Sequence, residues 1–180
     1  MKVFIGSSAE KLIDKKYIDV AEKISVKLSE SYDLVYGAAY YSIMGICYKI
    51  FKEGKKNIYA YTVEKYKSDF DKIEAAEEIL LDTTFERSKK IYEVSDLLLI
   101  MPGGIGTLSE LFSMLEESRS IPEFKPVIIF NYEGFYNKLL EFIDELISER
   151  FINPNIKEYY KIANSEDELF NLIELFKKEV

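Results

Sequence analysis

The 180-residue chain contains no histidine and no tryptophan, and it has a single cysteine, Cys47. Without histidine, neither a His-containing catalytic triad nor a His-ligated zinc site can be built. Any general acid or base must therefore be a carboxylate, a lysine, a tyrosine or the cysteine. One cysteine excludes an internal disulfide framework and favours a reducing compartment. Cys47 lies in an apolar helical pattern, which predicts a buried structural thiol.

Basic charge is also scarce, with 24 Lys and Arg against 32 Asp and Glu and a net charge of −8. Sequence-independent binding of a nucleic acid polymer needs a basic surface, so we do not expect that partner, whereas free nucleotides remain open. No apolar run approaches the roughly 20 residues of a membrane span. We therefore expect a cytoplasmic protein that is neither exported nor membrane-bound.

The most informative stretch covers residues 96–110 and reads DLLLIMPGGIGTLSE. Its five consecutive apolar residues, 97–101, predict a strand buried on both faces in the middle of a parallel sheet. Three glycines follow within the next five residues, which allows a tight turn and lets a ligand approach the backbone closely. From Thr107 the apolar residues recur at helical spacing. The stretch therefore predicts a strand, a glycine loop and the start of a helix.

Thr107 is predicted to be the N-cap of this helix, with Glu110 as its capping-box partner three residues on. The free N–H groups of a first helical turn and the helix dipole form a binding site for an anion such as phosphate. The alternative is a glycine loop that only turns the chain. Glu110 favours the ligand-binding interpretation because it places a carboxylate one turn into the helix, and this interpretation is compatible with the capping box.

Strands and helices alternate along the rest of the chain. Strands are predicted at residues 3–5, 33–36, 57–63, 79–81, 97–101, 127–130 and 159–162, and helices at 11–29, 40–53, 85–94, from 107, at 135–148 and at 165–178. With right-handed crossovers, this order predicts a Rossmann-like α/β fold, a doubly wound parallel sheet with helices on both faces in three layers. No linker interrupts the pattern, so we expect a single domain over residues 1–180.

A charged segment at residues 64–78 is predicted to be a surface loop or short helix. Four of its carboxylates, Asp71, Glu74, Glu77 and Glu78, suggest a metal site as one interpretation. Loops that bind hard cations usually add glycine and closely alternating oxygen ligands, which this segment lacks. A solvated face is therefore favoured, and no metal site is predicted.

Ligands of doubly wound sheets bind at the carboxyl ends of the strands. Three segments would converge there: residues 6–8, 37–39 and 102–107. In the first of them, Gly6, Ser7 and Ser8 offer N–H and hydroxyl groups to a ribose or phosphate; the alternative is a loop that ends in an N-cap.

The sequence PGGIGTLSE at residues 102–110 resembles the PGGxGTxxE signature of the LOG (Lonely Guy) family, Rossmann-like proteins formerly described as lysine decarboxylases. Arg87 falls at the arginine of the family's MxxRK motif. Further similar segments are VFIGSS at 3–8, LVYG at 34–37, MG at 44–45, KPV at 125–127 and GFY at 134–136. The glycine-glutamate signature is the specific part of this resemblance.

The resemblance implies hydrolysis of the N-glycosidic bond of a nucleoside 5'-monophosphate, of the AMP or cytokinin riboside monophosphate type, to free base and ribose 5-phosphate. It implies that Glu110 and Arg87 are catalytic, without a cofactor, in a homodimer. The substrate and its phosphate would be held by residues of the three convergent segments: Gly103, Gly104, Gly106, Thr107, Gly6, Ser7, Ser8 and Gly37.

The chain also departs from the family pattern. Where the family has GGGxxGLMG, residues 37–45 read GAAYYSIMG, so three glycines are replaced by Ala38, Ala39 and Ser42. Two tyrosines, Tyr40 and Tyr41, stand in the same segment. The lysine of the MxxRK motif is Ser88. A second class of function therefore stays open, a nucleotide-binding or sensing module that holds its ligand without cleaving it, similar to the SLOG superfamily or the molybdenum-cofactor carriers.

Overall fold

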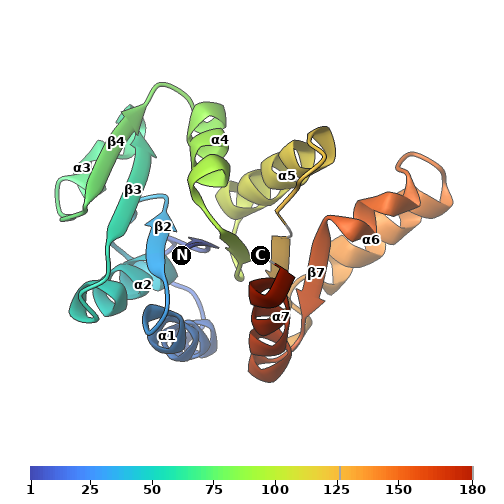
Figure 1. The fold of residues 1–180 in the computed structure, drawn as a ribbon. Coiled ribbons are helices and arrows are strands. Elements are labelled where there is room, and N and C mark those ends of the chain that lie inside the picture. The colour runs from blue at the N-terminus through green and yellow to red at the C-terminus, as the bar shows by residue number, and fades with distance from the viewer. Residues whose placement is uncertain (126, 180) are drawn as a thin grey trace.

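The computed structural model describes residues 1–125 and 127–179, with side chains up to residue 177. Pro126, the middle residue of the KPV segment, lies outside the described residues. The elements alternate as the sequence predicts (Figure 1). The strands are β1 (Lys2–Gly6), β2 (Asp33–Tyr36), β3 (Ile58–Val63), β4 (Glu77–Leu81), β5 (Leu97–Ile100), β6 (Val127–Phe130) and β7 (Tyr160–Ala163). The α helices are α1 (Lys15–Ser29), α2 (Ser42–Glu53), α3 (Lys67–Phe70), α4 (Thr84–Val94), α5 (Ile105–Ser120), α6 (Asn137–Ser148) and α7 (Glu166–Glu179).

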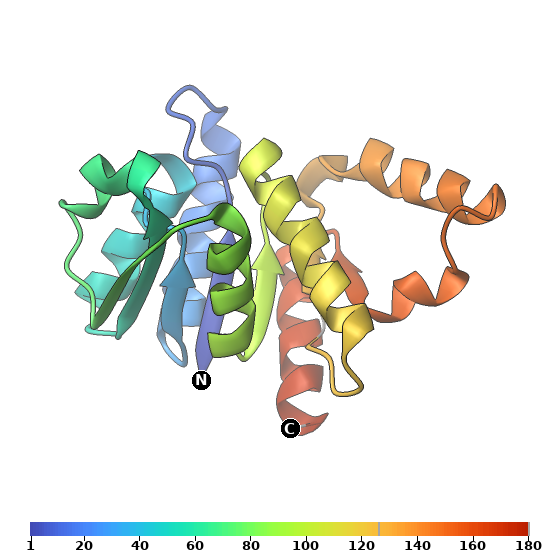
Figure 2. The same cartoon turned by 90° about the horizontal axis from the view of Figure 1, so that it is seen from above.

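The strands form one seven-stranded parallel sheet in the order β4-β3-β2-β1-β5-β6-β7. Side chains alternate between its two faces along each strand. On β1, Val3 and Ile5 pack with α1, α2 and α7, whereas Phe4 packs with α4, α5 and α6. The two groups of helices lie on opposite sides of the sheet (Figures 1 and 2). The predicted three-layer, doubly wound α/β fold is confirmed.

The strand order reverses between β1 and β5, since the chain builds outwards from β1 through β2, β3 and β4 and then returns to add β5 on its other side. Gly6 pairs with Ile100, and the Met101 N–H donates to the Gly6 carbonyl at 2.8 Å. The loops that follow β1 and β5 therefore start side by side. In this type of fold, such a topological switch point is where ligands bind.

Some boundaries differ from the prediction. The segment at residues 64–78 contains a 3₁₀ turn (Glu64–Tyr66) and the one-turn helix α3, and β4 begins at Glu77 instead of residue 79. β4 is an edge strand with alternating intermediate and exposed residues, so it lacks the apolar run that marks a central strand. None of the helices that the structure describes has the length and apolar content needed to span a lipid bilayer.

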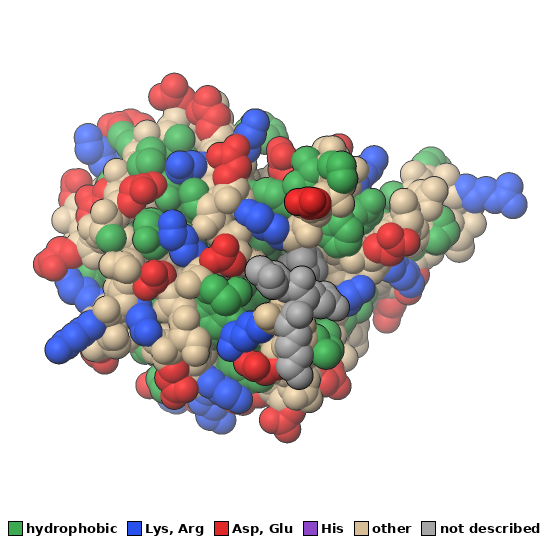
Figure 3. All heavy atoms as spheres, viewed as in Figure 1, with side chains coloured by type: hydrophobic (Ala, Val, Ile, Leu, Met, Phe, Trp, Pro, Cys, Tyr) green, Lys and Arg blue, Asp and Glu red, His purple; other side chains and the backbone are tan. Residues whose placement is uncertain are grey.

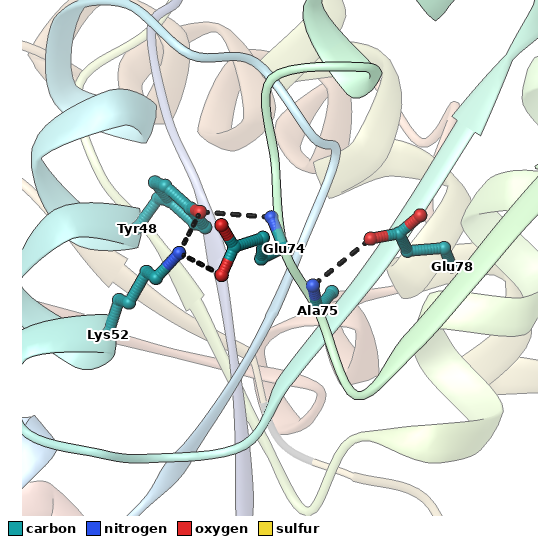
Figure 4. A network of polar contacts seen from close by, with 5 residues as sticks. All are labelled: Tyr48, Lys52, Glu74, Ala75 and Glu78. Atoms are coloured by element: carbon teal, nitrogen blue, oxygen red, sulfur yellow. Dashed lines mark hydrogen bonds and ion pairs between the residues drawn. The ribbon is translucent and has the colours of Figure 1, made fainter.

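Three of these four carboxylates have separate partners, two of which are shown in Figure 4. Glu74 pairs with Lys52 at 2.7 Å, and Glu78 accepts a hydrogen bond from the Ala75 N–H at 3.1 Å. Glu77 accepts a hydrogen bond from the Tyr61 hydroxyl at 2.6 Å. Within the described residues, no three Asp, Glu or Cys side chains are grouped so that they could hold a metal ion.

Candidate functional site

The glycine loop after β5 leads directly into α5, which begins at Ile105 with Gly104 as its N-cap. Gly104 has an extended backbone, and no side chain caps this helix end. The predictions of Thr107 as N-cap and of a capping box with Glu110 are therefore wrong. Residues 104–106 are exposed, and the first turn has no side-chain cap, two features that an anion site at a helix N-terminus requires.

Thr107 instead joins the two loops at the switch point. Its side chain is buried, and its hydroxyl donates to the Ser7 carbonyl at 3.0 Å. This bond connects the loop after β1 to the first turn of α5. Gly103 packs tightly against the same side chain, because a Cβ there would lie 2.1 Å from Thr107 Oγ1. At Gly104, by contrast, a Cβ would meet no heavy atom of the described residues within 4 Å.

Glu110 forms a buried ion pair with Arg87. Arg87 Nη2 lies 2.9 Å from Glu110 Oε1, and the two residues are 8% and 1% exposed. Arg87 stands one turn into α4, whose start is fixed by a capping box between Thr83 and Glu86. The pair therefore links α4 to α5, two helices on the same face of the sheet.

The second oxygen of Glu110, Oε2, and the Nε of Arg87 have no hydrogen-bond partner within the described part of the chain. Burial raises the pKa of Glu110 from its ordinary value of 4.5 to about 7, although the positive charge of Arg87 lowers it. A buried carboxylate with a free oxygen and a pKa near neutrality is typical of catalytic or ligand-binding groups.

The end of β2 lies against this pair. A Cβ on Gly37 would lie 3.6 Å from Glu110 Oε1 and 4.0 Å from Arg87 Nη1. Gly37 therefore lets the chain pass close to the two charged groups. The structure thus brings together Gly37, Arg87 and Glu110 and, at the neighbouring switch point, Ser7 with Thr107 and Gly103.

The other candidates in the loop after β1 have mixed environments. Ser7 is buried, and its Oγ has no hydrogen-bond partner in the described residues. Ser8 Oγ accepts a hydrogen bond from the Glu10 N–H at 3.1 Å, which forms a local turn, whereas the N-cap of α1 is Asp14. Gly6 is the last residue of β1, where a Cβ would lie 2.9 Å from Ile100 Cδ1, so packing against this side chain favours a small residue.

In the segment at residues 37–45, two residues that replace family glycines keep a backbone conformation typical of glycine. Ala38 and Ser42 have φ values of +64° and +57°, in the left-handed region that glycine adopts most easily. These are two of the three positions at which this chain replaces a glycine of the LOG pattern. Tyr40 and Tyr41 pack edge to face, with their ring centroids 5.9 Å apart, and the Lys11 ammonium lies 4.0 Å from the Tyr41 ring.

Tyr136, at the N-terminus of α6, is a neighbour of the site that sequence reasoning did not single out. Its hydroxyl donates to the Met101 carbonyl at 2.7 Å, at the first residue of the glycine loop. In the sequence, Tyr136 was marked only by its place in the GFY segment. That segment resembles the LOG family but does not indicate the hydrogen bond to Met101.

The parallel sheet, with helices on both faces and a topological switch point between β1 and β5, identifies the chain as a Rossmann-like α/β protein. The chain belongs to the LOG family, since the family profile described as "Possible lysine decarboxylase" matches residues 36–173. It is 32% identical over 174 residues to the cytokinin riboside 5'-monophosphate phosphoribohydrolase LOG1 of Arabidopsis thaliana, covering 96% of this chain and 81% of that protein. LOG3 of the same plant, with the same enzyme name, is 30% identical over 96% of this chain and 80% of its own length.

Solved structures show the same fold. The Moco carrier protein of Chlamydomonas reinhardtii superposes with a TM-score of 0.70 at 15% identity, over 99% of this chain and 98% of that protein. The molybdenum cofactor binding protein of Rippkaea orientalis gives a TM-score of 0.63 at 19% identity, over 96% and 94%. At these identities the likeness concerns the fold alone.

Proposed function

We propose that the protein hydrolyses the N-glycosidic bond of a nucleoside 5'-monophosphate, of the AMP or cytokinin riboside monophosphate type, to the free base and ribose 5-phosphate. The observation that carries this proposal is the buried Glu110–Arg87 pair one turn beyond a helix N-terminus that has no side-chain cap. The enzyme names of LOG1 and LOG3 support the same reaction class.

The 5'-phosphate would bind at the glycine loop, on the amides of Gly103, Gly104, Gly106 and Thr107. From Gly106 to Glu110 the helix rises about 6 Å, at about 1.5 Å per residue. This separation suits a ligand whose phosphate sits on the helix end while its sugar reaches the carboxylate. Ser7, Ser8 and Gly6 would lie on the ribose or phosphate side of the crevice, and Gly37 beside Glu110. Anchoring the phosphate away from the bond that breaks uses remote binding energy to orient the sugar.

In the reaction, the bond between C1' and the base nitrogen breaks and its electron pair leaves with the base. The sugar then develops oxocarbenium character, which the Glu110 carboxylate stabilises. A water molecule adds its oxygen to C1', and its proton passes to Glu110 and on to the base. A pKa of about 7 suits a group that must both accept and release a proton near neutrality. Arg87 orients the carboxylate and lowers its pKa.

Acidic side chains lie among the lysines and arginines of the face in Figure 3. The mixed charge of this face and the net charge of −8 count against binding of a nucleic acid polymer, which needs a broad basic surface. We further propose a single-domain cytoplasmic homodimer, which sedimentation at several concentrations and cell fractionation test.

Incubation with AMP, followed by chromatography for adenine and a chemical assay for ribose 5-phosphate, tests the reaction. We expect both products in equal amounts. Glu110→Gln should lower kcat by at least a hundredfold because it removes the charge that acts on the sugar. Glu116→Gln is the matched control, since Glu116 lies on the same helix but is exposed and paired with Arg119. Equal activity of the Glu110 and Glu116 variants would remove the catalytic assignment.

The second function class, ligand binding without cleavage, is favoured by one observation. Glu110 is 1% exposed, so a ligand reaches its carboxylate only after neighbouring side chains move. A pure binding protein would hold AMP or ribose 5-phosphate in calorimetry and release no adenine over long incubation. Release of adenine by the wild-type protein and not by Glu110→Gln excludes this class.

A further inference from the structure

Tyr136 connects the start of α6 to the glycine loop. Its side chain is 3% exposed, and its hydroxyl donates to the Met101 carbonyl at 2.7 Å. Burial raises the pKa of Tyr136 well above its ordinary value of 10.0, while a hydrogen bond with the Gly103 backbone lowers it and the charge of Glu110 raises it. The phenol therefore stays protonated and remains a donor over the working pH range.

Tyr136 is itself fixed by a polar network at the ends of β6 and β7. Asn131 Oδ1 accepts a hydrogen bond from the Tyr136 N–H at 2.7 Å, and the Asn131 N–H donates to the Ala163 carbonyl at 2.8 Å. Asn131 Nδ2 donates to the side-chain oxygens of Asn137 at 2.8 Å and Asn164 at 3.0 Å. Asn131 and Tyr136 are both buried, so the hydrogen bond between them is shielded from water.

From these contacts we infer that Tyr136 is a positioning residue that holds the glycine loop in its phosphate-binding shape. Thr107 ties the loop to β1 through the Ser7 carbonyl, and Tyr136 ties its other end to β6 and β7. A glycine-rich segment has many accessible backbone conformations, and ordering it in advance lowers the cost of binding. The inference rests on the proposed function in so far as the loop holds the phosphate.

The test compares Tyr136→Phe with Tyr160→Phe. Each change removes one hydroxyl, and Tyr160 is a buried tyrosine of the same core cluster that lies on β7, two strands from β5. Loss of the hydrogen bond from Tyr136 should speed amide hydrogen exchange of residues 101–108 on the order of tenfold. Ribose 5-phosphate should bind on the order of tenfold more weakly in calorimetry. With AMP as substrate, KM should rise by a similar factor while kcat changes little.

For Tyr160→Phe we expect exchange and affinity within twofold of the wild type. Exchange at residues 101–108 that is unchanged in Tyr136→Phe would overturn the inference, whatever the activity. Faster exchange with weaker ribose 5-phosphate binding supports it, also in a protein that releases no adenine. Faster exchange with unchanged affinity separates the two proposals: it supports a clamp on the loop and counts against the phosphate role of that loop.

Discussion

The Glu110–Arg87 pair makes a quantitative prediction about stability and pH. The folded protein holds the Glu110 pKa at about 7, against an ordinary value of 4.5 for the unfolded chain. Between these two values, the folded state binds a proton that the unfolded state does not. The free energy of unfolding therefore falls as the pH rises from 4.5 to 7 and is level on either side. At about 1.4 kcal/mol per pKa unit, this group alone changes the stability by about 3.5 kcal/mol over the full range from pH 4.5 to 7.

Glu110→Gln is neutral at every pH and loses this dependence. Many other carboxylates titrate in the same range, so the informative quantity is the difference in free energy of unfolding between the wild type and the variant. Urea unfolding at pH values from 5 to 8.5 measures it. With a denaturant slope of about 2 kcal/mol/M, the wild-type midpoint should fall by about 1.5 M relative to the variant across the interval. Denaturant slopes that stay equal show that the two unfolding transitions are comparable.

A second variant checks the role of the arginine. Arg87→Met removes the positive charge that lowers the Glu110 pKa, so the loss of stability should extend to higher pH than in the wild type. Glu110→Ala should lower the stability at pH 8 by about 3 to 5 kcal/mol, because it leaves the Arg87 guanidinium buried without a counter-ion. Two results would refute the reasoning. The difference in free energy of unfolding between the wild type and Glu110→Gln could be independent of pH, or the wild type could become more stable relative to the variant as the pH rises.

Two pairs of glycine substitutions test separate packing contacts, one by ligand affinity and the other by stability. Gly103→Ala should displace the Thr107 hydroxyl from its hydrogen bond to the Ser7 carbonyl and weaken ribose 5-phosphate binding on the order of tenfold in calorimetry. Gly104→Ala, whose Cβ would have open space, should change the affinity less than twofold. Equal effects of the two substitutions would contradict the packing argument. Gly45→Ala should lower the free energy of urea unfolding by about 1 to 3 kcal/mol, because its Cβ would lie 2.1 Å from the Tyr40 carbonyl oxygen. Gly54→Ala, whose Cβ would have 3.4 Å to its nearest neighbour, is the control, and an equal loss there would refute the clash.

The fold followed from the sequence because buried parallel strands carry continuous apolar runs. Residues 97–101 and 127–130 are such runs, and their prediction as buried strands is confirmed by β5 and β6. The edge strand β4 was predicted too short, since Glu77 and Glu78 belong to it without any apolar signal. Propensity patterns report burial, so the weakly buried edge of the sheet is where they carry least information.

At the site, the sequence indicated which residues matter, but not their partners. The spacing of Thr107 and Glu110 satisfied a capping-box pattern, yet the structure pairs Thr107 with the Ser7 carbonyl and Glu110 with Arg87. Both partners come from other parts of the chain, 100 and 23 residues away. A local pattern cannot indicate such contacts, and for the same reason the bond from Tyr136 to Met101 was not foreseen.

The missing cap is itself informative about function. A side chain that caps a helix satisfies the amides of the first turn, and those amides then have less capacity for a ligand. In α5 the N-cap is a glycine, and the two side chains that fit the capping pattern are bonded elsewhere. The N–H groups of the first turn thus have no side-chain cap, at a cost in helix stability of about a few tenths of a kcal/mol, the difference between glycine and a capping side chain. Because a binding site for phosphate requires this arrangement and a simple turn does not, introducing a cap with Gly104→Asp should weaken phosphate binding and raise the free energy of unfolding together.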